Sequence, residues 1–221
     1  MKSDYLKLME ERPELFKNTD VPGSIHIYTQ PNEITKVEKE QHAEIGILYE
    51  DNYIILLKDA VRYPNETDGT YIRIIYAAKK GGVVILPLWK DKDMREHRIL
   101  LLSHYRHATR RTYLEMPRGF AEESLSETEN VYKELFEETG CQISRLVPMG
   151  NLVSDTGLIG ETVKIYAAYL TGIPYTVDTI EGICNIQILS TETVKSMIRK
   201  GFIMDGYTLA TMALAQAKGI I

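Results

Sequence analysis

The pattern of apolar and polar residues predicts several strands in the first half of the chain. Short runs rich in β-branched and aromatic residues, bounded by glycine, proline or asparagine, are typical of strands. We expect strands at residues 24–29, 45–50, 53–57, 70–78, 83–88 and 99–105. A short amphipathic helix is predicted before them over residues 3–11, because Tyr5, Leu6 and Met9 recur at helical spacing.

A longer helix is predicted over residues 127–139. Ser126 followed by Glu129 has the spacing of a capping box, which would start the helix, and Gly140 is suited to end it. The apolar residues fall on one side of a helical wheel: Val131, Tyr132, Leu135 and Phe136. The acidic residues fall roughly opposite: Glu134, Glu137 and Glu138. We therefore expect the helix to pack on a sheet and to present its acids to a cleft.

The remaining pattern completes a mixed fold. Strands are expected at about 143–151 and 162–170, and helices at about 191–200 and 206–218. Strands and helices do not alternate regularly, which argues against a doubly wound parallel sheet. The predicted class is α/β in the broad sense, or α+β.

Composition narrows the class of protein. The chain has 221 residues, enough for one sizeable core or for a core with a small extra module. It is 44% hydrophobic and 26% charged, as is ordinary for a soluble globular protein. Its net charge of -5 argues against general binding to nucleic acid or membrane surfaces, because proteins that bind these anionic partners usually carry a basic surface patch. Cys141 and Cys184 have no CxxC spacing, and the N-terminus lacks the apolar run of a signal peptide. We expect a cytoplasmic protein with no membrane partner.

The acids of the predicted helix suggest metal chemistry. Glu134, Glu137 and Glu138 are spaced so that their carboxylates share one helix face, where like charges repel. Hard divalent cations prefer oxygen ligands and would turn this repulsion into attraction. The alternative is a solvated acidic face, which is the ordinary explanation for three such residues taken alone. The five histidines form no metal-binding spacing.

The same segment resembles the signature of the Nudix hydrolases. That box runs from a glycine, through a glutamate, to Arg-Glu-aliphatic-x-Glu-Glu-x-Gly and an apolar residue. The matching residues, in register, are Gly119, Glu134, Leu135, Glu137, Glu138 and Gly140, with Cys141 in the last apolar slot. Two positions depart: Leu125 replaces the first glutamate and Lys133 replaces the arginine. In the family these two residues brace the loop on the helix, so their loss puts that bracing in question.

Flanking segments resemble the ADP-ribose pyrophosphatase group in particular. Residues 105–107 and 113–117 are similar to the approach to the box, and residues 154–157 with Glu161 are similar to a catalytic loop. The resemblance implies a Nudix α/β/α sandwich with a mixed sheet in residues 80–221. It also implies a small β-rich N-terminal extension in residues 1–79, which would help to form a homodimer.

The resemblance further implies a set of site residues. Glu134, Glu137, Glu138 and the backbone carbonyl of Arg118 would hold two or three Mg²⁺ ions, with Mn²⁺ as a substitute. Glu161 would be the general base or an additional metal ligand, and Glu138 is the alternative base. Glu137 is the third candidate catalytic carboxylate. The substrate-binding candidates are Arg106, Arg118 and Glu115. The two arginines suit phosphate oxygens.

The implied reaction is hydrolysis of the pyrophosphate bond of a nucleoside diphosphate derivative. ADP-ribose, giving AMP and ribose 5-phosphate, is the leading substrate, although Arg118 and Asp155-Thr156 depart from what is common in that group. Another nucleoside diphosphate sugar or a dinucleotide is the alternative substrate. Two other classes remain open: a non-catalytic nucleotide sensor, and an interaction protein with an acidic helix. The expected partner is a small nucleotide, with no nucleic acid.

Overall fold

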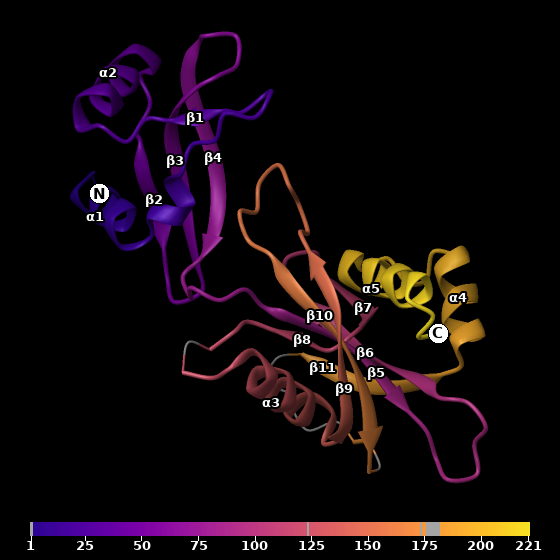
Figure 1. Ribbon diagram of the computed structural model, residues 1–221. Helices are drawn as coiled ribbons and strands as arrows, with labels where there is room; N and C mark the ends of the chain where they lie inside the picture. The colour runs from indigo at the N-terminus through magenta and orange to yellow at the C-terminus, as the bar shows by residue number, and fades with distance from the viewer. Residues whose placement is uncertain (1, 123, 173, 176–181) are drawn as a thin grey trace. The chain divides into compact units, whose positions relative to one another are not determined.

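The computed structural model describes residues 2–122, 124–172, 174–175 and 182–221. The chain forms two compact units, each with its own core (Figure 1). The first unit contains Met1–Lys79 together with Asp155–Glu161, and the second contains Lys80–Ser154 and Thr162–Ile221. The short segment 155–161 therefore belongs with the N-terminal part of the chain, although the domain that the resemblance implied at residues 80–221 includes it.

The first unit is an antiparallel sheet with two helices. Its elements are α1 (Lys2–Glu11), η1 (Pro13–Phe16), β1 (His26–Ile27), α2 (Pro31–Gln41), β2 (Gly46–Glu50), β3 (Ile54–Arg62) and β4 (Asp68–Tyr76). Strand β3 is central, because β1, β2 and β4 all pair with it in antiparallel orientation. The helices cover the sheet with apolar side chains that include Tyr5, Leu8, Ile34 and Val37.

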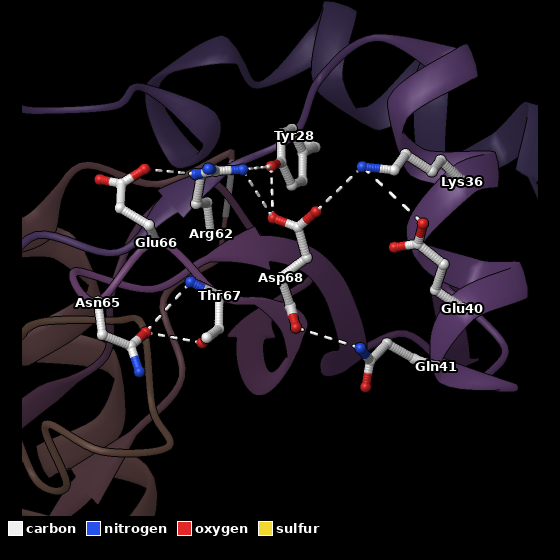
Figure 2. A network of polar contacts seen from close by, with 9 residues as sticks. All are labelled: Tyr28, Lys36, Glu40, Gln41, Arg62, Asn65, Glu66, Thr67 and Asp68. Atoms are coloured by element: carbon white, nitrogen blue, oxygen red, sulfur yellow. Dashed lines mark hydrogen bonds and ion pairs between the residues drawn. The ribbon is translucent and has the colours of Figure 1, made fainter.

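Polar groups also hold this unit together. Asp68, the first residue of β4, accepts hydrogen bonds from the Tyr28 hydroxyl at 2.7 Å and from Nη1 of Arg62 at 3.1 Å (Figure 2). Lys36 of α2 lies 3.5 Å from the other carboxylate oxygen, and Gln41 donates to the Asp68 backbone carbonyl at 3.1 Å. This network ties α2 to the β3–β4 hairpin.

The segment 155–161 is held along the outer edge of β4. The backbone N–H of Ile74 donates to the carbonyl of Leu158 at 2.8 Å, and the N–H of Gly160 donates to the carbonyl of Ile74 at 2.9 Å. Ile159 and Ile74 form a parallel β-bridge. These bonds satisfy edge groups of β4 that the sheet itself leaves unpaired.

The second unit is built on a mixed sheet. Its strands are β5 (Val83–Trp89), β6 (Arg98–Arg106), β7 (Arg111–Glu115), β8 (Arg118–Gly119), β9 (Gln142–Leu152), β10 (Val163–Thr171) and β11 (Ile183–Leu189). The strand order is β11-β6-β5-β10-β9, with β7 beside β6 and β8 beside β5. Strands β5 and β10 are parallel, and the other pairs are antiparallel.

Helices cover both faces of this sheet. Helix α3 (Glu127–Thr139) lies on one face, and α4 (Thr191–Arg199) and α5 (Gly206–Ala217) lie on the other (Figure 1). Alternate residues of β5 prove the layering: Val83 and Ile85 pack in the α3 core, and Val84 packs in the core with α4 and α5. A strand buried on both faces is uninterruptedly apolar, as residues 83–88 are. The predicted α/β/α sandwich with a mixed sheet is confirmed.

The sequence pattern missed several elements. Helix α2 begins at Pro31 without a side-chain hydrogen bond from its N-cap residue Gln30, and only Ile34 and Val37 are buried in it. It therefore shows neither a capping motif nor a long apolar stripe. The strand predicted over residues 24–29 is shorter in the structure, where β1 covers only His26–Ile27. Strands β7, β8 and β11 were not predicted. No helix in the described residues is long and apolar enough to cross a membrane.

Candidate functional site

Helix α3 begins and ends where the sequence predicts. The Ser126 hydroxyl accepts from the backbone N–H of Glu129 at 3.2 Å, and the Glu129 carboxylate accepts from the N–H of Ser126 at 2.8 Å. This is the predicted capping box. Gly140 ends the helix with φ 68°, in the left-handed region that glycine occupies without strain. The helix is thus positioned by its own sequence at both ends.

The face that α3 turns to the sheet differs from the expected one. Val131 and Leu135 are fully buried, but Tyr132 and Phe136 are exposed by 43% and 49%. Glu138 is only 3% exposed. The expectation that both aromatic residues pack on the sheet was therefore wrong. The buried row follows residues 131, 135 and 138, spaced at three and four residues, and this rotation draws one of the acids inward.

Gly119 and Glu134 are in close contact. Strand β8 pairs Gly119 with Val83, whose side chain faces α3. A β carbon added to Gly119 would stand 2.1 Å from Cδ of Glu134 and 2.2 Å from its Oε2. Only glycine allows the carboxylate to lie this close to the backbone of the loop. Glu138 lies one helical turn beyond Glu134, so the two carboxylates share a face.

Glu137 points into a different environment. Its side chain is 48% exposed and accepts a hydrogen bond from Nζ of Lys133 at 2.9 Å. The structure therefore brings Glu134 and Glu138 onto one row of the helix and leaves Glu137 beside it, in an ion pair. A metal-binding or catalytic role for Glu137 stays a prediction.

The loop before α3 is braced by a residue that sequence reasoning missed. Nζ of Lys133 lies 2.9 Å from the Glu122 carboxylate, in addition to its bond with Glu137. Hydrogen bonds to Glu137, and then to Glu122, raise the pKa of Lys133 above its ordinary value. Leu125 has no acid to offer, so Glu122, three residues earlier, is the loop acid that pairs with this lysine. The spacing of the Nudix box, which the sequence resembles, could not reveal that Glu122 takes this place.

Other contacts hold the same loop. The backbone N–H of Glu122 donates to Oδ1 of Asn130 at 3.1 Å, and Nζ of Lys80 donates to the carbonyl of Leu125 at 2.7 Å. Asn130 is fully buried on α3, one turn before Glu134. The loop is therefore tied to α3 at several points, despite its departures from the Nudix pattern.

Glu115 holds both of the candidate phosphate-binding arginines. It is 2% exposed, and its Oε2 accepts from Nε and Nη2 of Arg106 at 2.9 and 2.6 Å. Nη2 of Arg118 donates to the same oxygen at 3.1 Å. One buried carboxylate thus brings two guanidinium groups together, while the Arg106 and Arg118 side chains stay 30% and 22% exposed. The two guanidinium groups have further N–H groups that could donate to an anion. The contacts of Glu115 indicate that this residue positions the two arginines.

Glu161 lies in the first unit. Its carboxylate accepts from Nη2 of Arg12 at 3.3 Å and from the backbone N–H of Tyr76 at 3.2 Å. The side chains of Arg12 and Glu161 are 6% and 11% exposed. These contacts attach the end of the segment 155–161 to the first unit. Its role as a general base stays a prediction.

The donor set can be compared with the demands of Mg²⁺. No group of three or more histidine, cysteine, aspartate or glutamate side chains in the described ranges is arranged to hold an ion. Mg²⁺, however, commonly uses one or two carboxylates, and takes its other ligands from water and from substrate phosphates. Because Gly119 has no side chain, the Glu134 carboxylate can lie directly beside the loop backbone. Glu138 lies on the same face of α3, one turn further on. These residues fit a hard cation.

Comparison with known proteins supports the fold. No known family model matches the sequence, and none of the curated proteins matches it. The chain is similar to a solved structure described as "Crystal structure of ADP compounds hydrolase", with a TM-score of 0.65 and 15% sequence identity. The similarity covers 80% of this chain and 95% of that chain. The chain has a Nudix-like fold. Likeness at this identity shows the fold alone.

Proposed function

We propose that the protein hydrolyses the pyrophosphate bond of a nucleoside diphosphate derivative in a Mg²⁺-dependent reaction. The observation that carries the proposal is the contact between Gly119 and the Glu134 carboxylate, with Glu138 one turn further on. A solvated acidic face would need no glycine at this contact and would not bury Glu138 to 3% exposure. The Nudix-like fold supports the same reading.

Glu134 and Glu138 would hold the metal, together with the backbone carbonyl of Arg118. When bound, Mg²⁺ supplies charge neutralisation of the diphosphate and lowers the pKa of a coordinated water. Arg106 and Arg118 would bind non-bridging phosphate oxygens with the N–H groups that Glu115 leaves unused. Glu115 keeps the two guanidinium groups together without itself reacting.

A carboxylate must accept the proton of the attacking water. Glu161 is the first candidate, on the resemblance of its loop, and Glu138 is the second. Glutamine at either position keeps the shape of the side chain and removes its ability to take the proton. Comparing Glu161→Gln with Glu138→Gln therefore assigns the base. Glu137, paired with Lys133, is the third candidate.

ADP-ribose is the substrate we favour, with hydrolysis to AMP and ribose 5-phosphate. The structurally similar protein is described as a hydrolase of ADP compounds, which favours an adenosine diphosphate derivative. Another nucleoside diphosphate sugar or a dinucleotide is the alternative within the same reaction. A nucleotide sensor would bind the same compounds without releasing product.

The test is a panel of nucleoside diphosphate derivatives incubated with Mg²⁺, with phosphate-containing products measured by chromatography. We expect ADP-ribose to be cleaved, and Glu138→Gln to lose roughly three orders of magnitude or more in kcat, as expected when a ligand or base is removed. Glu192→Gln, on the exposed part of α4, is the matched control for loss of one charge. Binding without cleavage would favour the sensor, and neither binding nor cleavage would contradict both.

We further propose that the first unit mediates a homodimer. Its sheet carries exposed apolar side chains, among them Tyr49 and Ile72 at 52% and 43% exposure. Light scattering of the purified chain would give the mass. A mass of one chain at micromolar concentration would exclude a stable dimer.

A further inference from the structure

The first turn of α5 is attached to the segment that leads into the glycine loop. Asp205, the N-cap residue of α5, accepts from the backbone N–H and the hydroxyl of Thr208 through Oδ2, both at 2.8 Å. The Thr208 hydroxyl in turn accepts from the backbone N–H of Met116 at 3.0 Å. Both Thr208 and Met116 are buried. The helix start and residues 116–118 therefore form one bonded assembly within the second unit.

The same helix start holds the side chain of Arg118. The second oxygen of Asp205, Oδ1, accepts from Nη1 of Arg118 at 3.2 Å. The guanidinium also lies over the ring of Tyr207, with Cζ 4.6 Å from the ring centroid. On another side, Nη2 reaches Glu115 at 3.1 Å. Two acids and one aromatic face thus determine both the position and the plane of this group.

We propose that Asp205 and Tyr207 are positioning residues that orient the Arg118 guanidinium for a phosphate group of the substrate. The inference rests on the proposed function, and it adds α5 to the site. An arginine side chain loses considerable rotational freedom when it binds, and a side chain that is already held loses less. Asp205 divides its two oxygens between the helix cap and the arginine, so one residue links the order of α5 to the order of Arg118.

Asp205 has a useful matched substitution. Asparagine is as good an N-cap as aspartate, because its single side-chain oxygen can still accept from the backbone N–H of Thr208. In Asp205→Asn the charge that holds Arg118 is lost while the cap is kept. Ser190→Ala is the complementary control, because Ser190 caps α4 through the N–H of Thr193. That variant removes a cap from the neighbouring helix and leaves the Asp205–Arg118 pair in place.

The experiment measures steady-state kinetics with ADP-ribose and Mg²⁺, the melting temperature, and the ¹⁵N relaxation of the Arg118 Nε–H group. Asp205→Asn should raise KM about tenfold, as expected for loss of a charge-assisted hydrogen bond, with kcat changed less than about twofold. Its melting temperature should fall by a few degrees at most, because the cap is kept and Arg118 retains Glu115 as a partner, and the Arg118 Nε–H order parameter should fall. Tyr207→Leu should also raise KM and lower the order parameter. Tyr207→Phe keeps the aromatic ring and should therefore have the wild-type KM.

Ser190→Ala should lower the melting temperature and leave both KM and the Arg118 order parameter unchanged. An Asp205→Asn protein with wild-type KM and an ordered Arg118 would overturn the inference. An Arg118→Lys protein with wild-type KM would also overturn it, because Arg118 would then only attach the loop segment to α5. If the wild-type chain cleaves no compound in the panel, the proposed function fails. The relaxation measurement then still decides whether Asp205 orders the arginine.

Discussion

The carboxylate of Glu134 lies against the α carbon of Gly119, in the space that any other side chain would fill. A β carbon at this position would stand 2.2 Å from Oε2 of Glu134. The backbone of Gly119 does not have a positive φ, so the glycine is required for the contact and not for its conformation. The absence of a side chain at Gly119 is therefore what lets the loop and helix α3 approach each other at this point.

Gly119→Ala should therefore remove activity without unfolding the protein. The added methyl group meets the end of a flexible side chain, so the Glu134 carboxylate moves and the fold survives. We expect a loss of roughly 100-fold in kcat/KM, because misplacing a ligand by about 1 Å has effects of that size. Gly206→Ala is the control, since a β carbon there meets nothing within 4 Å. Equal rates for the two variants would separate Gly119 from the site.

Mg²⁺ should stabilise the folded protein, as any ligand of the native state does. At a free concentration of 100 times Kd the gain is about 2.7 kcal/mol, which a thermal melt detects readily. Glu134→Gln and Glu138→Gln should each abolish most of this shift, while Glu192→Gln should retain it. A shift that survives in both site variants would place the ion elsewhere.

Glu161→Gln distinguishes a catalytic role of Glu161 from a role in attaching the segment 155–161 to the first unit. Glutamine can still accept from Arg12 and from the backbone N–H of Tyr76, the two donors that contact Glu161. A general base should show a loss of about 100-fold or more in kcat, and this is the result we expect. The melting temperature should fall as well, because the neutral amide leaves the buried charge of Arg12 without its anionic partner. A near-wild-type rate would instead make Glu161 a residue that only attaches the segment 155–161 to the first unit.

Arg12→Met tests how much the ion pair between Arg12 and Glu161 contributes to stability. Removing one partner from a buried ion pair leaves the other charge unpaired, and typically costs about 3–5 kcal/mol. The side chains of Arg12 and Glu161 are 6% and 11% exposed, so a cost toward the lower end is expected. Urea denaturation monitored by circular dichroism measures it. An unchanged midpoint would show that the pair contributes little to stability.

The stability of the first unit should fall in acid through Asp68. The hydrogen bond from Tyr28 is the largest effect lowering the pKa of Asp68, with Lys36 and Arg62 adding to it. A carboxyl whose pKa is lower in the folded state stabilises the fold above its unfolded pKa, which is about 3.9. That contribution is lost as the pH falls from about 4 through the folded pKa.

Asp68→Asn tests this dependence. The variant should lose about 1–3 kcal/mol of unfolding free energy at pH 7, because Arg62 and Lys36 lose their anionic partner. Below the folded pKa of Asp68 the difference between variant and wild type should shrink. Urea melts at pH 7 and at pH 3 provide the measurement. A difference of the same size at both values would show that the charge of Asp68 is not the cause.

The local signals in the sequence predicted helix α3 well, because its limits depend on neighbouring residues. Ser126, Glu129 and Gly140 act within one turn of the helix ends, and such short-range chemistry needs no tertiary information. The apolar run at 83–88 likewise predicted a buried central strand. Helix α2 escaped prediction because its N-cap residue makes no side-chain capping bond and most of its residues are exposed.

The assignment of roles within the site needed side-chain contacts that residue spacing does not specify. Spacing placed Glu134, Glu137 and Glu138 together, but Glu137 forms an ion pair with Lys133, and Glu138 is buried. The ion pair of Glu122 with Lys133 supplies the bracing that the departures from the Nudix pattern at Leu125 and Lys133 had put in question. Residue spacing alone predicts neither the ion pairs of Lys133 nor the burial of Glu138, because the surface on which a helix packs sets its rotation about its own axis.

By itself the sequence determined that a capped acidic helix follows a glycine loop in a mixed α and β chain. These properties depend on backbone conformations and hydrogen bonds between near neighbours, which residue types specify directly. Only the tertiary structure decided that Glu115 joins two arginines, that Asp205 of α5 holds Arg118, and that Glu161 lies with the first unit. Asp205 and Arg118, like Glu161 and Arg12, are far apart in the chain, and Glu115 and Arg106 lie on the neighbouring strands β7 and β6. Only folding brings these groups within hydrogen-bond distance.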